Sequence, residues 1–477
     1  MRLPPPSRRL PVPRPRLGAE ALAVLALAWP LVLTKLSQMA MTVTDALVLG
    51  HLSAEALAAA ALAATLYWTL LAPGFGLAMA AAPLLAQLRG RGHRPLRGRR
   101  GTVHASALAV GLAVLPAWAV LWWAGPVLRL LGQPAELADL AQIYVRPMMW
   151  GLLPFCLFIV LRGLLAAEER PRAALVVAIG GIAANALLCW GLVFGAWGMP
   201  ALGIAGAGLA SSLANGLMLL GLWAAVARDR RLRRLRLFRP LRHDAPPWAG
   251  LGQVLRLGLP IAGNMVLEVG AFSAAAILVG GFGPVAVAAH AIALQIASTT
   301  FMVPMGIGQA ATARVGLAIG GFRPAAARRA GWVAIGLGAG FMAAMGVVLV
   351  THPASLAGLF LSAADPLGPA VLAVAVPLLI AAGVFQLADG VQAVTAGALR
   401  GLGDTRVPML LAGVGYWMVG LPGGWLLANP LGLGPIGVWA GLALGVGAVA
   451  VLMALRWHRL ARRGGLTPLR GLRPSLP

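Results

Sequence analysis

Residues 30–50 read PLVLTKLSQMAMTVTDALVLG, and residues 260–280 read PIAGNMVLEVGAFSAAAILVG. Each stretch begins with proline, ends with glycine and is about as long as the roughly 20 apolar residues that cross a bilayer as a helix. Further glycine and alanine positions recur at the same separation of 230 residues: Ala58 and Ala288, Gly76 and Gly306, Gly90 and Gly320. The alternative is chance coincidence in a chain with 62 glycines. The order of the matches favours an internal duplication.

Two later motifs extend the repeat toward the ends of both halves. Leu161-Arg162-Gly163 recurs as Leu399-Arg400-Gly401, and Gly203-x-x-Gly206 recurs as Gly434-x-x-Gly437. If each half crosses the membrane six times, both halves start on the same side. They then form parallel repeats about an axis along the membrane normal, with a substrate cavity between two lobes that rock to give alternating access.

The apolar runs between clusters of Gly, Pro and Arg predict an all-α integral membrane protein with twelve transmembrane helices in two six-helix lobes related by pseudo-two-fold symmetry. The predicted spans are 21–49, 54–87, 102–125, 137–165, 173–195, 202–227, 251–280, 285–317, 328–351, 368–399, 405–428 and 434–458. Hydrophobic residues make up 60% of the chain and charged residues only 11%, which excludes an ordinary soluble protein. The mean hydropathy of +0.86 agrees.

The net charge of +25 raises the question of nucleic-acid binding. All but one of the 38 basic residues are arginine, and they gather in short connections between apolar runs. This is the distribution that keeps basic loops in the cytoplasm, so we expect no nucleic-acid partner.

The arginine-rich connections alternate along the chain, which sets the predicted orientation. The N-terminal tail and the second and sixth connections hold five, six and eight arginines, whereas Arg129 is the main exception on the other side. Both termini are therefore predicted to lie on the cytoplasmic side of an inner membrane. The predicted organisation is a Pro/Arg-rich cytosolic tail (1–20), an N-terminal lobe (21–227), a basic cytosolic linker (228–250), a C-terminal lobe (251–458) and a basic cytosolic tail (459–477).

Thirteen acidic residues are present, and only Asp45, Glu268 and Asp389 fall well inside predicted spans. A carboxylate in hydrocarbon costs several kcal/mol, so each should face a cavity or a partner. Desolvation favours the protonated form, which suits proton uptake and release, and carboxylate oxygens also suit sodium. The structural alternative is hydrogen bonding between helices.

Four further polar residues within the predicted spans are candidates for a functional role. Lys35 is about 15 Å along a helix from Asp45 and cannot pair with it directly; it either extends its stem toward polar groups or serves as a cavity cation. Gln38 occupies the repeat position of Glu268. Asn185 can offer a carbonyl oxygen to a cation or hydrogen-bond a carboxylate; the alternative is an amide that packs between helices. His290 is interpreted as a packed or interface histidine.

Signatures of enzymes are missing from the sequence. Cys156 and Cys189 lie inside apolar runs and give neither a disulfide framework nor metal-ligand spacing. No nucleotide-binding loop, His-Glu-x-x-His motif or catalytic triad is present in the spans. We therefore expect a transporter, not an enzyme, with no cofactor and with transport driven by an ion gradient.

Several motifs resemble the multidrug and toxic compound extrusion (MATE) transporters, especially their NorM-like branch. They are the 30–50 stretch, PLLAQ (83–87), LGLPIAGNMVLEVG (257–270), FQLADGVQAVTAGALRGLGDTRVP (385–408) and YWMVGLPGGWLLANPLGLGPIGVWAGLALG (416–445). The resemblance covers residues 20 to 458 approximately, and it is the order and spacing of the motifs that make it specific.

The resemblance implies an antiporter that exports lipophilic, mostly cationic compounds as sodium or protons enter. It implies that Asp45, Glu268, Asp389 and Asn185 bind the coupling ion, with the three carboxylates as candidate Na⁺ ligands. Gln38, Lys35 and Phe385 are the expected substrate-cavity residues.

The chain departs from the family pattern at two positions. Cys189 stands where relatives often have Asn or Asp, and Lys35 where they usually have a neutral residue, which leaves the coupling ion and the cargo charge open. The rival interpretations are a lipid-linked oligosaccharide flippase of the wider superfamily and a membrane enzyme or assembly factor without transport. Because one chain supplies both lobes, we expect a monomer embedded in the lipid bilayer.

Overall fold

The computed structural model describes residues 17–92, 96–235, 237, 247–361 and 366–462, and within these ranges it is helical, with no strand. The α-helices are α1 (Leu17–Leu52), α2 (Ala54–Met79), α3 (Ala81–Gly90), α4 (Leu96–Trp122), α5 (Ala124–Leu130), α6 (Ala135–Met148), α7 (Leu152–Ala167), α8 (Arg172–Phe194), α9 (Ile204–Arg228), α10 (Leu251–Gly280), α11 (Pro284–Gly320), α12 (Pro324–Thr351), α13 (Pro353–Gly358), α14 (Gly368–Leu402), α15 (Arg406–Gly413), α16 (Leu421–Ala428) and α17 (Gly434–Arg462). Short 3₁₀ segments are η1 (Met149–Gly151), η2 (Ala196–Gly198), η3 (Leu232–Leu235) and η4 (Pro247–Gly250), and η5 (Val414–Gly420) is a π-helix.

Within the described residues, twelve helical segments are long and apolar enough to cross a membrane, which confirms the predicted architecture. Three of them join two helices into one span: 54–90, 135–167 and 406–428. Proline explains the first two interruptions, since it lacks the N–H that bonds the carbonyl four residues earlier. Pro83 follows the break between α2 and α3, and Pro154 follows the 3₁₀ turn η1.

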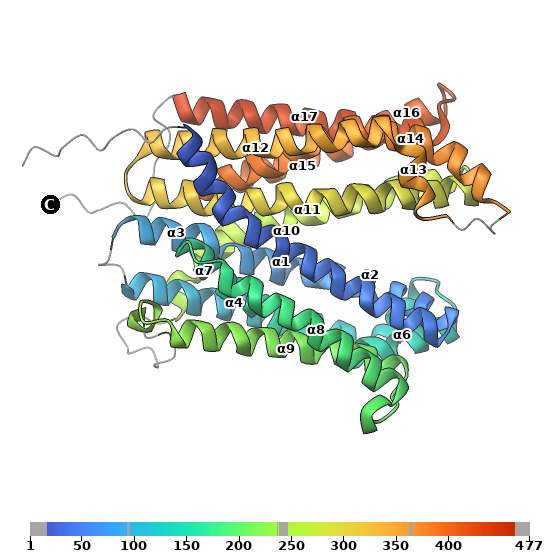
Figure 1. Ribbon diagram of the computed structural model, residues 1–477, viewed down its shortest axis with the longest axis horizontal. Coiled ribbons are helices and arrows are strands. Elements are labelled where there is room, and N and C mark those ends of the chain that lie inside the picture. The colour runs from blue at the N-terminus through green and yellow to red at the C-terminus, as the bar shows by residue number, and fades with distance from the viewer. Residues whose placement is uncertain (1–16, 93–95, 236, 238–246, 362–365, 463–477) are drawn as a thin grey trace, which may run out of the picture.

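The buried apolar side chains form two cores, one for each half of the sequence, and each core borrows a segment from the other half. The first core is built mainly from α2 to α9 but includes Val254, Leu257 and Ile261 of α10. The second is built mainly from α10 to α17 but includes the 24–31 segment of α1. Figure 1 shows α1 starting beside the C-terminal helices and crossing toward α8. The exchange of α1 and α10 ties the two lobes together.

The lobes meet closely at one end of the bundle, where glycines allow backbone to touch backbone. A Cβ at Gly76 would overlap Ala262, and one at Gly306 would overlap Val32. Val32 and Ala262 are themselves 230 positions apart, so the two contacts are the same contact made twice. Gly90 against Leu317 and Gly320 against Gln87 form a second such pair. The lobe interface therefore has the approximate two-fold symmetry that the repeat predicts.

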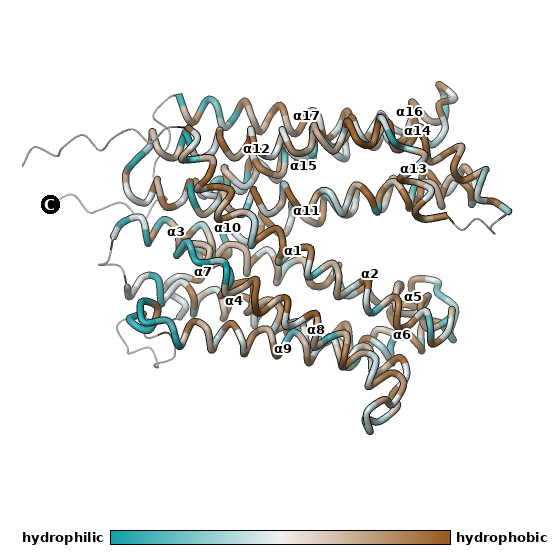
Figure 2. Tube along the Cα trace, in the orientation of Figure 1, coloured by the Kyte–Doolittle hydropathy of each residue, from teal (hydrophilic) through white to brown (hydrophobic). Residues whose placement is uncertain are grey.

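The end where the lobes meet is also the basic end of the molecule, and we use that name for it. Arg89 and Arg99 pair there with Glu168, and Arg314 pairs with Glu20 and Glu169. Figure 2 shows hydrophilic colour gathered at this end, on the left of the view. The opposite end is called the loop end and includes the turns after Leu52, Phe194 and Ala428.

The outermost predicted segments differ from the structure. α1 begins at Leu17, so residues 17–20 of the predicted tail are its first turn, which the Glu20–Arg314 ion pair holds in place. α17 continues to Arg462 beyond the predicted lobe boundary. Residues 1–16 and 463–477 of the tails, and residues 236 and 238–246 of the predicted linker, lie outside the described part of the chain.

Candidate functional site

Asp45 lies on α1 at the contact with α8 and α9, where only 8% of it is exposed. Its Oδ2 accepts a hydrogen bond from the Ser211 hydroxyl at 2.5 Å, and its Oδ1 accepts one from Asn185 Nδ2 at 3.1 Å. The Cys189 thiol, one turn after Asn185 on α8, also hydrogen-bonds this carboxyl group. Three neutral donors from two helices therefore surround Asp45, and no cation pairs with it among the described residues.

Asn185 retains one unused acceptor in this cluster. Its side chain is completely buried, and its Oδ1 has no hydrogen-bond partner. A buried orphan acceptor usually has a water or an ion nearby in a working protein. The atoms that a small cation would find here are therefore Asn185 Oδ1, the two Asp45 oxygens and the Ser211 hydroxyl oxygen.

A pocket of about 60 Å³ opens beside Asp45, with a lining of mixed character. Polar atoms come from Gln38, Thr42, Asp45, Ser211 and Asn215, and apolar surface comes from Met41, Tyr67, Trp68, Met148, Phe155 and Met218. The Trp68 ring lies edge-on to Phe155, with 6.2 Å between ring centroids. Aromatic faces attract organic cations, and flexible methionines adapt to differently shaped apolar groups. The pocket has room for an ion with its waters or for the head of a larger molecule.

The second acidic cluster lies in the C-terminal half, on α10 and α14. Asp389 is 6% exposed and interacts electrostatically with Glu268, and Glu268 in turn interacts with Arg400. The Tyr416 hydroxyl, on the π-helix η5, is near both carboxyl groups. No described residue forms an ion pair within 4 Å with Glu268 or Asp389. Unlike Asp45, neither carboxyl group accepts a hydrogen bond from a described side chain.

Several buried polar atoms around this second cluster have no partner. They are both amide atoms of Gln386, Gln392 Oε1, Thr395 Oγ1 and the Tyr416 hydroxyl. All lie on α14 or η5, in the half of the chain that holds Glu268 and Asp389. Unpaired polar groups at such density are typical of an interior that takes up water or a ligand. Unpartnered polar atoms therefore lie on α14, the helix that carries Asp389, and on η5.

The structure separates the predicted site residues into groups. Asp45 and Asn185 come together in one lobe, and Glu268 and Asp389 in the other. Gln38 lines the pocket beside Asp45, with its Nε2 unpartnered. The Lys35 ammonium lies 5.1 Å from the centroid of the Phe75 ring, a cation–π contact.

The remaining two candidates belong to an aromatic cluster. Phe385 is 2% exposed and packs edge-on against Phe272 and Trp439, so in this conformation it belongs to the core of the second lobe. His290 accepts a hydrogen bond from Trp439 Nε1 at 3.1 Å. The structure therefore places His290 as the packed histidine that the sequence predicts.

Sequence reasoning missed Ser211 and the aromatic side of the pocket. Ser211 and Ser212 are adjacent polar residues inside a largely apolar span, which is a signal that could have identified them. Ser212 donates to the carbonyl of Pro147 beside the η1 interruption, so only Ser211 faces Asp45. Tyr67 and Trp68 give no comparable signal, because aromatic residues are common in membrane spans.

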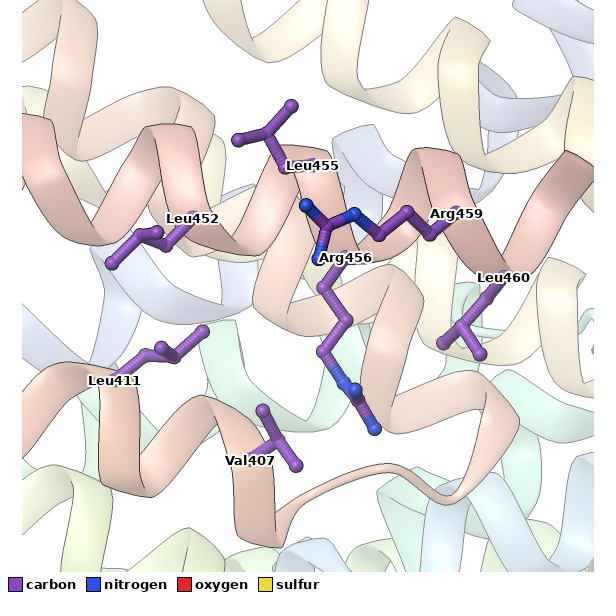
Figure 3. A pocket seen from close by; sticks show the side chains of 7 residues that line it. All are labelled: Val407, Leu411, Leu452, Leu455, Arg456, Arg459 and Leu460. Atoms are coloured by element: carbon purple, nitrogen blue, oxygen red, sulfur yellow. The ribbon is translucent and has the colours of Figure 1, made fainter.

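A larger pocket of about 560 Å³ lies on the outer surface, away from both acidic clusters. Figure 3 shows its lining from α15 and α17: Val407, Leu411, Leu452, Leu455, Arg456, Arg459 and Leu460. Arg456 is held by Asp404 at 2.6 Å. The apolar floor and the arginines at the basic end suit a surface that faces lipid, so this groove is not on the path between the lobes.

The chain is similar to a known family and to named proteins. A family model described as MatE matches residues 30–191 and 260–426. A probable multidrug resistance protein NorM of Mesorhizobium japonicum is 48% identical over 444 residues, covering 93% of this chain and 94% of that protein. The multidrug resistance protein NorM of Burkholderia vietnamiensis is 41% identical over 450 residues, covering 93% and 95%.

Solved structures share the fold at lower identity. The eukaryotic MATE transporter AtDTX14 superposes with a TM-score of 0.82 at 22% identity, over 94% of this chain and all of that one. A MOP superfamily transporter from Pyrococcus furiosus, for which a binding pocket of reverse polarity is described, gives a TM-score of 0.81 at 20% identity over 94% and 96%. At these identities the likeness concerns the fold alone.

Proposed function

The chain belongs to the MatE family of multidrug and toxic compound extrusion transporters, and we propose that it exports lipophilic, mostly cationic compounds in exchange for an inward flow of protons or sodium. The observation that supports this most strongly is the pocket beside Asp45. It places one carboxyl group next to aromatic and methionine side chains, which is a chemistry that binds an organic cation and a coupling ion in turn.

The side chains around Asp45 are poorly arranged to coordinate sodium, so we propose a proton as the coupling ion. Ser211 and Asn185 point hydrogens at the carboxyl group, whereas a sodium ion would need their lone pairs. Cys189 offers sulfur where an oxygen ligand would suit sodium better. Sodium remains the second candidate through the unpartnered Asn185 Oδ1.

The basic end is proposed to face the cytoplasm of a bacterial cell, with the chain in the inner membrane and both helix ends Leu17 and Arg462 on the cytoplasmic side. Because the lobes are packed together at that end, the structure then corresponds to the outward-facing conformation. Gln87 Nε2 donates across the lobe interface to the Gly401 carbonyl at 2.9 Å, which adds to the closure.

In the proposed cycle, the outward-facing form releases its cargo when Asp45 takes up a proton. The protonated protein opens at the basic end, releases the proton there and binds new cargo. The two fluxes are coupled because proton and cargo differ in their affinity for the two conformations. Glu268 and Asp389 are proposed as a second ion-binding cluster, and a monomer contains both lobes.

A lipid-linked oligosaccharide flippase is the second candidate, since Lys35, Arg162 and Arg400 give the inter-lobe region basic groups. Such cargo carries phosphate, which arginine binds well. The aromatic and methionine lining beside Asp45 favours organic cations instead.

The test is ethidium efflux from reconstituted vesicles with a pH gradient or a sodium gradient imposed separately. The wild type is compared with Asp45→Asn and with Asp139→Asn, a matched control whose carboxyl group is exposed at the loop end and paired with Arg129. We expect pH-driven efflux in the wild type and in Asp139→Asn, and its loss in Asp45→Asn.

Efflux driven by a sodium gradient alone would show that sodium, and not the proton, is the coupling ion. An Asp45→Asn variant that folds and still exports at the wild-type rate under either gradient would refute the assignment of Asp45. Failure of several cationic dyes to move in the wild type would favour the flippase.

A further inference from the structure

A small cavity of about 30 Å³ lies between the lobes near the basic end, apart from both acidic clusters. The first half contributes Arg162 of α7 with apolar residues of α1, α2, α3 and α7, and the second half contributes Gln309 and Thr312 of α11 and Arg400 of α14. Arg162 and Arg400 occupy matching positions of the repeated Leu-Arg-Gly motif. Two arginines, one from each lobe, therefore line the same cavity.

Both arginines lack an ion-pair partner among the described residues. Arg162 is only 3% exposed and its Nη1 has no hydrogen-bond partner. By contrast, Arg89 and Arg99 pair with Glu168 at this end of the molecule. Arg314 pairs there with Glu20 and Glu169. A permanently charged guanidinium that is buried without a partner is strongly unfavourable. The two arginines therefore need a negative charge nearby to balance them.

The neighbouring charges do not supply it. Arg400 interacts electrostatically with Glu268, whereas the neighbour of Arg162 is Lys35, a basic residue. The two arginines outnumber the one carboxyl group that interacts with them, which leaves an excess of positive charge around the cavity. An anion in the cavity would balance it.

Beside the arginines, the polar lining includes one free donor, since Gln309 Nε2 has no partner among the described residues. Thr312 gives its hydroxyl proton to the carbonyl of Gly308 or Gly397, so it offers the cavity no donor. No described carboxylate lines the cavity. The volume suits one small ion with a water molecule and is far below the roughly 300 Å³ of a pocket for an organic ligand.

From these observations we infer that Arg162, Arg400 and Gln309 bind a small inorganic anion of the size of chloride, which bridges the two lobes. Because the two arginines belong to different lobes, the site is complete only while the basic end is closed. Bound anion therefore stabilises the closed basic end, and opening that end releases the anion. The site itself does not depend on the transported compound; its effect on transport rests on the proposed alternating access.

The experiment measures the thermal unfolding midpoint of the purified protein in sodium gluconate, as chloride or bromide replaces gluconate at constant ionic strength. We expect a saturable rise in the midpoint for the wild type. The rise should disappear in Arg162→Gln and in Arg400→Gln and persist in Arg323→Gln, which removes an exposed arginine at the same end. Bromide located by anomalous scattering in crystals provides a readout that needs no variant.

An equal midpoint in gluconate and chloride for the wild type would overturn the inference, as would a chloride response that survives in both Arg162→Gln and Arg400→Gln. Formate that raises the midpoint where chloride does not would assign the cavity to a carboxylate instead and would also overturn it. These outcomes are independent of ethidium efflux, so failure of the anion site and failure of the proposed function can be told apart.

Discussion

The two lobes are alike where they touch and different where they hold charge. Gly90 and Gly320 make equivalent contacts with the opposite lobe at the basic end, and Gly76 and Gly306 do so deeper in their membrane spans. The acidic clusters show no such equivalence. Asp45 has three neutral donors, and its repeat position in the second half is Ala275.

The acidic cluster of the second lobe differs from that of the first in its neighbours. Glu268 lies at the repeat position of Gln38, and it is near another carboxyl group, Asp389, and unpartnered polar atoms. Symmetric packing is required if two lobes are to rock about one axis, whereas ion chemistry is required at only one place. The two halves of the duplicated chain therefore share their packing contacts but differ in their acidic and polar residues.

The largest expected effect separates the two acidic clusters. Asp45→Asn should lower gradient-driven ethidium efflux by about 100-fold or more, equivalent to about 2.7 kcal/mol, because the proposed coupling carboxyl group is gone. Asp389→Asn should lower it less, because Glu268 remains in the same cluster. Initial efflux rates of the two variants in matched vesicles check this. A larger loss in Asp389→Asn would reverse the roles assigned to the lobes.

The next effect tests the symmetric interface. A Cβ at Gly320 would overlap the Gln87 carbonyl, and a Cβ at Gly90 would overlap that of Leu317. Gly320→Ala and Gly90→Ala should each prevent close packing at the basic end and lower efflux by about tenfold or more. Spin-label distances between the lobes at that end should increase in both variants.

The matched control for the interface variants is Gly280→Ala, since a Cβ there meets nothing within 4 Å. It should leave both efflux and the inter-lobe distance unchanged. If Gly90→Ala were harmless while Gly320→Ala was not, the interface would be functionally asymmetric and the comparison between the lobes would have to be revised.

The smallest effect concerns buried hydroxyl groups in the two lobes. Ser211→Ala removes a donor from Asp45 and should destabilise the folded protein by about 1–3 kcal/mol. Thr395→Val removes a hydroxyl group that has no partner, so it should change stability by less than about 1 kcal/mol or raise it. Unfolding midpoints in one detergent compare them. Equal destabilisation by the two variants would mean that the buried hydroxyl groups of both lobes are equally well hydrogen-bonded.

The spans were predictable because hydrophobic length alone decides whether a segment crosses a membrane. The predicted 251–280 span coincides with α10, and others differ by a few residues at polar ends. α11 runs to Gly320, beyond the predicted end at 317, because Gly320 packs against Gln87 of the other lobe. Sequence patterns do not contain such long-range contacts.

The exchange of α1 and α10 between the cores, and the π-helix η5, were not predictable for a related reason. In a membrane span, the face toward protein and the face toward lipid are both apolar, so hydropathy does not show which neighbour a helix packs against. The cost of burying charge did identify Asp45, Glu268 and Asp389 as candidates. It could not show that Ser211 and Cys189 reach Asp45, since neither is costly enough to stand out.

The central claim is that Asp45 exchanges a proton for cargo. The most direct measurement is proton release from the purified protein in weakly buffered solution when ethidium binds. We expect proton release in the wild type and in Asp139→Asn, and ethidium binding without proton release in Asp45→Asn. Equal proton release by the wild type and by Asp45→Asn, or binding by the wild type with no release at all, would contradict the claim.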